Sequence, residues 1–435
     1  MVSELNIGYA WIITIAALVA TVIVVMAPPN GIYFPYMIDY YEESAAKVGM
    51  ALTLITSLRY SCGVFSAIMA KAFGCRIVMI FGSITMICGY ILIAYSTSII
   101  EVYLACCLIG FGICLSYYTS FFVIDVNFKK HFNLMMSIKV GLAGVGHVMS
   151  PYVYQRFVIS YGWKHAFLLH SAVVYHLVLC GVIFRPSTNK KSNEEAEEIS
   201  LLEVKQENNS PKLDLQTGIT PTDEKMRFNW LQYIYKICHL RLFKKHSFVI
   251  LVVVSLIQGA TEDGVEVLMP DDMLERGASL HHSQLILAVY GASSTCGRPF
   301  QYILSKFVLN DLLIQLGLSY FLSFLSLLIC ITTKTDNAVY VVMVFYGFSM
   351  GWYSGIIPLI VKSTVDDDFF FGYAWVGCAY GVGACIAVPF LGYLRDISGH
   401  FWLSEFSMLC FTLINIMIIF GFIVWKRTRK QGQTC

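Results

Sequence analysis

The sequence predicts an all-α integral membrane protein with twelve transmembrane helices in two six-helix bundles. Three observations predict this fold class: the composition, the spacing of the apolar runs, and one long polar segment near the middle of the chain. Of the 435 residues, 57% are hydrophobic and only 13% are charged, whereas a soluble domain carries roughly a quarter charged residues. This much apolar surface indicates that the solvent of the protein is a lipid bilayer.

Twelve apolar runs are long enough to cross a bilayer, which takes about 20 residues of helix. The first run lacks a small-residue cleavage site and is longer than the core of a signal peptide, so we expect it to remain as the first helix. The predicted helices cover residues 9–36, 48–73, 77–96, 99–124, 133–158, 164–185, 247–269, 283–305, 311–332, 337–362, 370–393 and 401–425.

The polar segment divides these helices into two sets of six. We expect an N-terminal bundle over residues 1–185, a flexible cytosolic linker over 186–246, a C-terminal bundle over 247–425 and a cytosolic tail over 426–435. The linker is too polar to bury a core of its own.

The charges in the short loops predict the orientation in the membrane. The breaks that hold Lys71, Lys130 and Lys426 alternate onto one side, whereas the breaks that hold Asp39 and Asp272 lie on the other. Because cytosolic loops carry an excess of lysine and arginine, we expect both termini in the cytosol.

The two halves carry a weak internal repeat. Glycines in the fifth helix of the first half and in the fifth helix of the second are related by one offset, 381 − 144 = 237. Parallel repeats of six helices are typical of secondary transporters. The glycine pairs at this offset are 144 and 381, 146 and 383, and 162 and 399.

Four local motifs are distributed along nearly the whole chain apart from the linker. They are NIGYAW at 6–11, KAFGCRIVMIFG at 71–82, NFKKHFNLMMSIKVGLAGVG at 127–146, and, in the second half, LAVYGASSTCGRP at 287–299 with GYLRDISG at 392–399. Together they resemble the monocarboxylate transporter family of the major facilitator superfamily. The motif at 127–146 is the more specific of the four, and the one at 6–11 is degraded.

The resemblance implies a secondary transporter that moves small monocarboxylates or related organic solutes across the plasma membrane by alternating access. Two alternatives stay open. One is a facilitative carrier, uncoupled from protons, of a non-lactate solute such as an amino acid derivative. The other is a protein that no longer transports and acts as a sensor or membrane partner.

Other functions are not expected. The chain has no phosphate loop, GxSxG, HExxH or CxxC motif, which argues against an enzyme. Most of its 14 cysteines lie in apolar runs as small hydrophobic residues, so no metal or cofactor is expected. The net charge of +2 is too small for a nucleic-acid partner. Expected partners are the solute, membrane lipid and, as in some family members, a single-span glycoprotein.

Ionisable side chains deep in a membrane are the first candidates for substrate contact. The resemblance implies that Arg298 holds the substrate carboxylate, since a guanidinium can donate two parallel hydrogen bonds to it. A second interpretation is that Arg298 only satisfies carbonyls freed by Pro299. Arg59 is expected near the midplane, where substrate contact and a packing or salt-bridge role are both open.

Two positions depart from the proton-coupled members of the family. Where those members carry a lysine in helix 1 and an aspartate in helix 8, this chain has Asn30 and Ser294. We still expect both residues at the substrate site. Neither side chain titrates, so the family's proton coupling is in doubt.

Three carboxylates, Glu262, Asp263 and Glu266, stand near the outer end of the seventh helix. They either couple transport to protons or ions, or line a solvated mouth. Lys139, two turns inside the fifth helix, is expected to extend its long side chain to the cytosolic interface, with substrate contact as the alternative.

A last set of residues lies at the membrane edges. Arg76, Arg395 and Asp396 resemble superfamily positions that latch helices in one conformation. Such latches would tune the alternating-access equilibrium without touching substrate.

Overall fold

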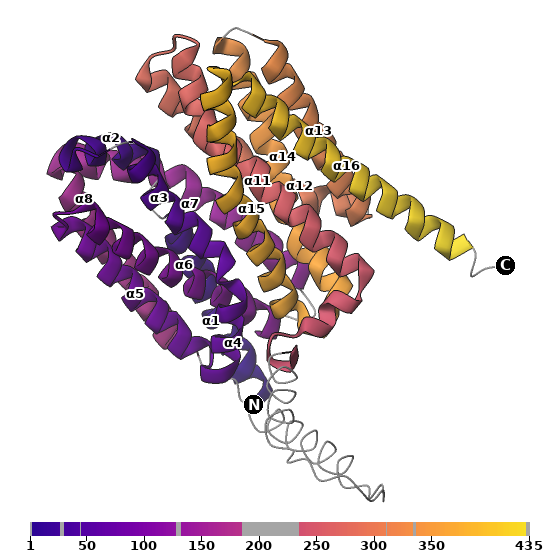
Figure 1. The fold of residues 1–435 in the computed structure, drawn as a ribbon. Helices are drawn as coiled ribbons and strands as arrows, with labels where there is room; N and C mark the ends of the chain where they lie inside the picture. The colour runs from indigo at the N-terminus through magenta and orange to yellow at the C-terminus, as the bar shows by residue number, and fades with distance from the viewer. Residues whose placement is uncertain are drawn as a thin grey trace, which may run out of the picture.

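The structure is a computed structural model that describes residues 2–26, 30–43, 45–127, 132–184, 235–309, 311–333 and 336–431. Every regular element within these ranges is a helix (Figure 1). The protein is therefore all-α, as the composition predicts.

Each of the twelve predicted runs falls on a helix or a pair of helices. In the first half these are α1 (Val2–Val25), α2 (Asn30–Tyr41), α3 (Ala45–Ser61), α4 (Gly63–Phe73), α5 (Cys75–Tyr95), α6 (Ile99–Asn127), α7 (Phe132–Tyr161) and α8 (Trp163–Ile183). In the second they are α11 (His246–Glu275), α12 (Leu280–Phe307), α13 (Leu312–Thr332), α14 (Asp336–Val365), α15 (Phe369–Ser398) and α16 (Trp402–Gln431), with short 3-10 helices η1 (Leu240–Lys244) and η2 (Asp366–Asp368).

Among the described residues, nine helices are long and apolar enough to cross a membrane, and α3 with α4 makes a tenth span. The remaining two predicted spans are the more polar α12 and the pair α1 and α2. The chain is thus a multi-pass membrane protein.

The second predicted helix is bent, although its sequence predicts one continuous span over 48–73. Its two parts, α3 and α4, meet at 52°. The backbone of Cys62 leaves the helical conformation with a ψ of 9°, and the next residue, Gly63, lies against the ring of Tyr118, where a Cβ atom would come within 2.6 Å of Cζ. Close packing at a glycine therefore accompanies the kink, which lies three residues after Arg59.

The repeat at offset 237 is present in the packing between the halves. Gly144 on α7 lies against Thr295 on α12, and Gly381 on α15 lies against Ser61 on α3; a Cβ atom on either glycine would come within 2.8 Å of its neighbour. Because α7 and α15 are the fifth helices of their halves and α3 and α12 the second, the matched glycines serve matched contacts. Small residues let membrane helices approach this closely.

The other two glycine pairs also match. Gly146 packs on the backbone of α1 and Gly383 on that of α11, the first helices of the two halves. Gly162 and Gly399 end α7 and α15 with φ values of 79° and 72°, a region that favours glycine.

Two segments at the edges of the predicted linker and tail are structured, and the predicted domain limits themselves stay a prediction. Residues 235–245, placed in the linker, fold onto the second half: Leu242 is buried, and the Trp375 indole donates a hydrogen bond to the Cys238 carbonyl at 2.9 Å. Residues 426–431, placed in the tail, continue α16. The rest of the predicted linker, up to residue 234, lies outside the described residues.

The halves meet mainly where the bent span of α3 and α4 packs on α15 and where α7 packs on α12. Smaller contacts join α7 with α14 and α6 with α15. Figure 1 shows the halves in contact near α4 and the start of α15 and diverging toward α2 on one side and the far end of α13 on the other. We call the contact end the basic end, because it carries Lys71 in the last turn of α4, Arg76 at the start of α5 and Lys426 near the end of α16. The acidic end carries Glu43, Asp272 and Glu275.

Candidate functional site

A layer of charged and tyrosine side chains lies between the two halves, about midway along the helices. It is built from α3, α6 and α7 of the first half and α11, α12 and α15 of the second. The close glycine contacts described above bring these helices together, so the layer depends on the same packing as the interface.

Arg59 lies in the last turn of α3, beside the bend. Its guanidinium stands 5.2 Å from the ring centroid of Tyr60 and 5.1 Å from that of Tyr117. Such cation–π contacts stabilise a charge that is removed from water. The Nε atom of Arg59 is buried and has no hydrogen-bond partner among the described residues.

The position of Lys139 along its helix predicted that its side chain extends to the cytosolic interface. In the structure it does not. The residue is fully buried, and its ammonium donates to the hydroxyls of Thr21 at 2.7 Å and Ser120 at 2.6 Å. The ammonium also lies 3.8 Å from the ring centroid of Phe121. The snorkelling prediction is wrong because Lys139 lies on the face of α7 that packs on α1 and α6, with no open path to the interface.

Arg298 comes from α12 and reaches the other half. One terminal nitrogen donates to the carbonyl of Val140 on α7 at 3.3 Å. Its Nε atom, like that of Arg59, is buried without a hydrogen-bond partner in the described part of the chain. Two arginines from opposite halves therefore each keep a spare N–H donor.

The three carboxylates of α11 face the layer at different depths. Tyr290 donates to Glu262 at 2.9 Å, and Tyr380 donates to Asp263 at 3.3 Å. Asp263 is 7% exposed, whereas Glu266 is exposed. The burial of Asp263 argues against a solvated mouth at that residue, and the role of the three carboxylates stays a prediction.

Charges of the two halves act on one another across the layer. Asp263 and Glu266 of the second half interact electrostatically with Arg59 of the first half. Glu262 interacts with Arg298 within the second half. With Lys139, the layer holds three basic and three acidic side chains, so its formal charge balances.

The two positions that depart from the family are placed differently. Ser294 is buried where its backbone carbonyl touches Gly351 of α14, inside the C-terminal half. Asn30 is the first residue of α2. The side chain of Asn30 lies outside what the structure describes, and no hydrogen bond among the described residues joins Ser294 to either arginine.

The interface is sealed toward the basic end by aromatic rings from both halves. Phe121 stacks on Tyr373 with centroids 4.6 Å apart, and Phe132 meets Phe369 at 4.9 Å. These contacts lie between the charged layer and the basic end, so they separate the layer from that side.

A salt bridge between the halves lies beyond the aromatic seal. The ammonium of Lys362, near the end of α14, lies 2.8 Å from a carboxylate oxygen of Asp125, near the end of α6. The two side chains are 21% and 12% exposed. We call this pair the basic-end gate.

For two of the three residues proposed as latches, the described contacts do not join the halves. Arg76 is exposed. Arg395 lies 4.6 Å from the ring centroid of Phe401 within its own half. The side chain of Asp396 lies outside what the structure describes. The latch role of all three stays a prediction.

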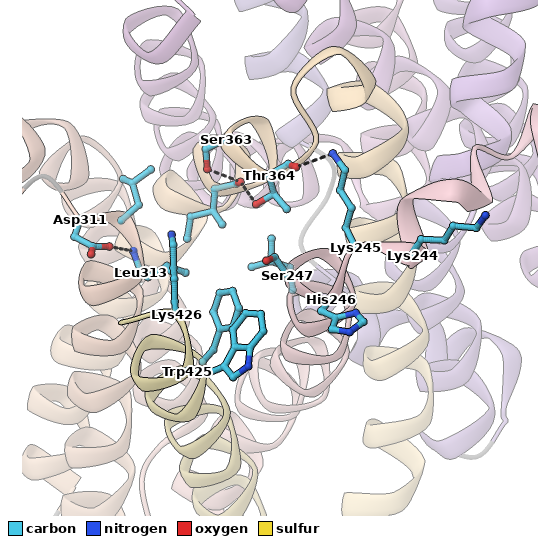
Figure 2. Close-up of a pocket in the computed structure, with 14 residues that line it drawn as sticks. Lys244, Lys245, His246, Ser247, Asp311, Leu313, Ser363, Thr364, Trp425 and Lys426 are labelled. Carbon is cyan, nitrogen blue, oxygen red and sulfur yellow. Dashed lines mark hydrogen bonds between the residues drawn. The ribbon is translucent and has the colours of Figure 1, made fainter. Parts of the chain in front are cut away.

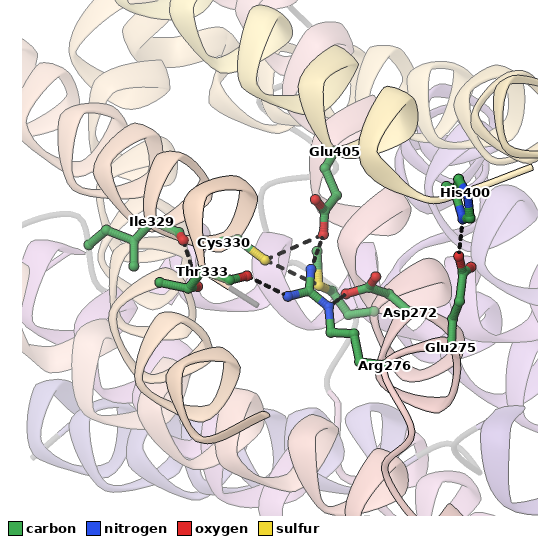
Figure 3. Close-up of polar contacts among 9 residues, drawn as sticks. Asp272, Glu275, Arg276, Ile329, Cys330, Thr333, His400 and Glu405 are labelled. Carbon is green, nitrogen blue, oxygen red and sulfur yellow. Dashed lines mark hydrogen bonds and ion pairs between the residues drawn. The ribbon is translucent and has the colours of Figure 1, made fainter. Parts of the chain in front are cut away.

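A separate polar cluster holds the acidic end of the second half together (Figure 3). Arg276 donates to Asp272 at 2.8 Å, to Glu405 at 2.9 Å and to the Thr333 carbonyl at 2.7 Å. In the described chain, Asp272, Cys330 and Glu405 are the one group of three side chains close enough to share a metal ion. Because the guanidinium already bridges both carboxylates, the cluster is an ion-pair network joining α11, α13 and α16.

Sequence reasoning missed several members of the site. Tyr290 and Tyr380, which hold the carboxylates, carried no signal because tyrosines in membrane helices are common. The gate residues Asp125 and Lys362 did carry one, since 362 − 125 = 237 is the offset of the glycine repeat.

Comparison with known proteins identifies the class. The chain matches the Major Facilitator Superfamily over residues 10–369, most of its length. It therefore belongs to this superfamily and is a membrane transport protein, not an enzyme.

Its relatives narrow the assignment. Monocarboxylate transporter 13 of Rattus norvegicus is 24% identical over 402 residues, covering 91% of this chain and 85% of that protein. Monocarboxylate transporter 12 of Xenopus laevis is 24% identical, covering 98% and 91%, and monocarboxylate transporter 2 of Mesocricetus auratus is 23% identical, covering 89% and 78%. The chain is a divergent, monocarboxylate transporter-like member of the superfamily, and its solute is a small organic molecule.

Proposed function

We propose that the protein is a plasma-membrane secondary carrier that moves a small carboxylated solute by alternating access, with both termini in the cytosol. The two halves would rock about the charged layer, opening it first to one side and then to the other. In this topology the structure represents the state closed toward the cytosol. A single-span glycoprotein that assists surface delivery belongs to the same proposal.

One observation carries the choice of a carboxylated solute. Arg59 and Arg298 come from opposite halves, and each keeps a buried Nε–H donor without a partner in the described chain. An unmade hydrogen bond at a buried charged group is costly, so a carboxylate between them would satisfy donors that the protein leaves open. A solute that bridges both halves is also one that can couple to their movement.

The test is uptake of a panel of labelled carboxylates in oocytes, with surface protein measured in parallel. For a transported solute, Arg298→Ala should lower uptake at least tenfold. Arg298→Lys should rescue it poorly, because an ammonium keeps the charge but loses the planar pair of donors. Lys306→Ala, on the same helix but at the basic end, is the matched control. Undiminished uptake by both Arg298 variants would overturn the assignment.

A second candidate is a carrier of a zwitterion such as an amino acid derivative, without proton coupling. Because three basic and three acidic side chains balance in the layer, a bare carboxylate adds one uncompensated negative charge. That charge is costly in a site removed from water. Either a proton enters with the anion, or the solute carries its own amine, which Glu262 and Asp263 would bind beside their tyrosine partners.

Cytosolic pH during uptake separates the two candidates. Acidification that matches solute entry supports an anion with a proton, and constant pH supports the zwitterion. For a zwitterion, Glu262→Gln and Asp263→Asn should abolish uptake of the amine-bearing solute at every pH; for a proton-coupled anion they should instead flatten the pH profile. A solute that stabilises the purified protein without being translocated would replace both candidates by a sensor.

A further inference from the structure

A cavity of about 950 Å³ opens at the basic end of the second half, away from the charged layer (Figure 2). It lies among the start of α11, the start of α13, and the ends of α14 and α16. Its volume is in the range of pockets that bind whole organic ligands, and no role described above uses it.

The lining of this cavity is basic. Lys244, Lys245, His246 and Lys426 contribute to it, and Asp311 is its one acidic member. The Asp311 carboxylate is engaged, since it accepts a hydrogen bond from the Leu313 backbone N–H at 3.0 Å and caps α13. Three lysines thus line the cavity, although the side chain of Lys244 points away from the other two (Figure 2). The one carboxylate already caps α13.

Backbone groups add to the positive potential. Helix α11 is 30 residues long, and its N-cap residue, Lys245, makes no side-chain cap hydrogen bond. The first N–H groups of a helix carry a partial positive charge and are a ready site for phosphate. The start of α11 lies in the cavity wall, so this partial charge and the lysines act on the same space.

The position of the cavity indicates that a lipid is the source of the anion. On α16, Phe420 is 66% and Val424 47% exposed, as expected of a surface that faces acyl chains. The exposed apolar surface ends at Trp425, which is followed by Lys426, and both line the cavity. Tryptophan followed by lysine is typical of the level of the lipid headgroups.

We propose that this cavity binds the phosphorylated headgroup of an anionic phospholipid, with Lys245 and Lys426 as its main charged contacts. Basic pockets between transmembrane helices at the cytosolic side are suited to polyphosphorylated headgroups. A headgroup there would bridge α11, α14 and α16. It would also bear on the basic-end gate, because Lys245 donates to the Thr364 carbonyl at 3.1 Å, two residues after Lys362.

The test is binding of dioctanoyl phosphatidylinositol 4,5-bisphosphate to the purified full-length protein, followed by native mass spectrometry and by thermal shift. The double variant Lys245→Gln/Lys426→Gln should bind roughly 25-fold more weakly, taking about fivefold for each lysine near an anionic surface. The variant Lys245→Arg/Lys426→Arg keeps both charges and should retain binding. Lys236→Gln/Lys306→Gln removes two lysines outside the cavity and should bind like wild type.

Two comparisons identify the source of the anion. Dioctanoyl phosphatidylcholine, which lacks net charge, should not stabilise the protein. Soluble inositol trisphosphate should bind much more weakly than the lipid, because it lacks the acyl chains that lie along α16. Equal affinity for the soluble phosphate would overturn the lipid assignment, and equal lipid binding by the cavity variant and wild type would overturn the site. The double glutamine variant can be unstable without lipid. In that case Lys245→Gln alone is compared with the arginine variant, and weaker lipid binding by Lys245→Gln supports the site while equal binding overturns it.

Discussion

The basic-end gate makes a direct prediction about which state the protein occupies. Asp125 and Lys362 join the two halves at the end where they are closed, so removing the pair should favour opening toward that side. Asp125→Asn is the cleaner perturbation, because Lys362 also donates to the Asp366 carbonyl at 3.1 Å and keeps that partner.

The magnitude follows from the separation and the burial of the two charges. At 2.8 Å, two unit charges attract by about 6 kcal/mol at an effective dielectric constant of 20 and by about 1.5 kcal/mol in water. The side chains are 21% and 12% exposed, and desolvation offsets much of the larger figure. Charged hydrogen bonds contribute about 1.5–3 kcal/mol net, which corresponds to a roughly 10- to 150-fold shift in the ratio of closed to open states.

Hydrogen–deuterium exchange measures this shift without introducing new cysteines. A peptide over 363–372 covers the end of α14, η2 and the start of α15, whose surroundings change when the gate opens. Its exchange should accelerate about tenfold or more in Asp125→Asn, because exchange follows the population of the open state. A peptide over 396–404, at the acidic end, is the control and should not change in this way.

Charge reversal separates an electrostatic gate from a merely structural contact. Asp125→Lys alone and Lys362→Asp alone place like charges opposite each other and should open the basic end further than Asp125→Asn. The two together restore an attractive pair and should recover at least half of the lost protection. Wild-type exchange in Asp125→Asn, or a double variant no better than either single reversal, would refute the gate.

Three further predictions concern packing and stability. Gly381→Leu should abolish transport, because its side chain would collide with α3, whereas Gly392→Leu, in open space on the same helix, should not. Arg276→Ala should destabilise the protein by about 3 kcal/mol, since it leaves buried carboxylates unpaired; the melting temperature should fall, while His400→Ala, at an exposed pair, should have little effect, and equal shifts would contradict this. Burial and the nearby Lys71 ammonium lower the pKa of His239, so the unfolded chain binds the proton more readily and the free energy of unfolding should decrease as the pH falls below about 6.5; His239→Gln should remove that part of the slope in melts between pH 5.5 and 7.5, and an unchanged slope would refute it.

The positions of the helices along the chain were predictable because hydropathy reports how much of a segment lies in lipid. Hydropathy does not report direction within a span. The bend between α3 and α4 was therefore missed, even though Gly63 was visible, because a glycine in a membrane helix marks close packing as often as a kink.

For a single side chain too, the sequence gives its depth along the helix but not the direction in which it points. The sequence places Lys139 two turns inside its helix, and at that depth a lysine reaches the interface only if its face of the helix is open. The face of α7 that carries Lys139 packs on Thr21 and Ser120, whose hydroxyls provide the hydrogen bonds that the interface would otherwise supply. Which face packs on which helix is a tertiary property, and no local pattern around Lys139 specifies it.

Unlike the contacts of Lys139, the contact between the two residues of the basic-end gate is indicated by the sequence, through the internal repeat. The halves of a parallel repeat are related by rotation about an axis that runs along the membrane normal. A residue and its repeat equivalent can touch each other only if both lie near this axis. Asp125 with Lys362 and Phe132 with Phe369 are two such pairs at the offset of 237, and both are in direct contact. The axis therefore passes between α6 and α14 and between the starts of α7 and α15 at the basic end. Opposite charges at equivalent positions near the axis can pair only with each other, from one half to the other. The offset found from the glycines therefore indicates, through such a pair, where the two halves are joined.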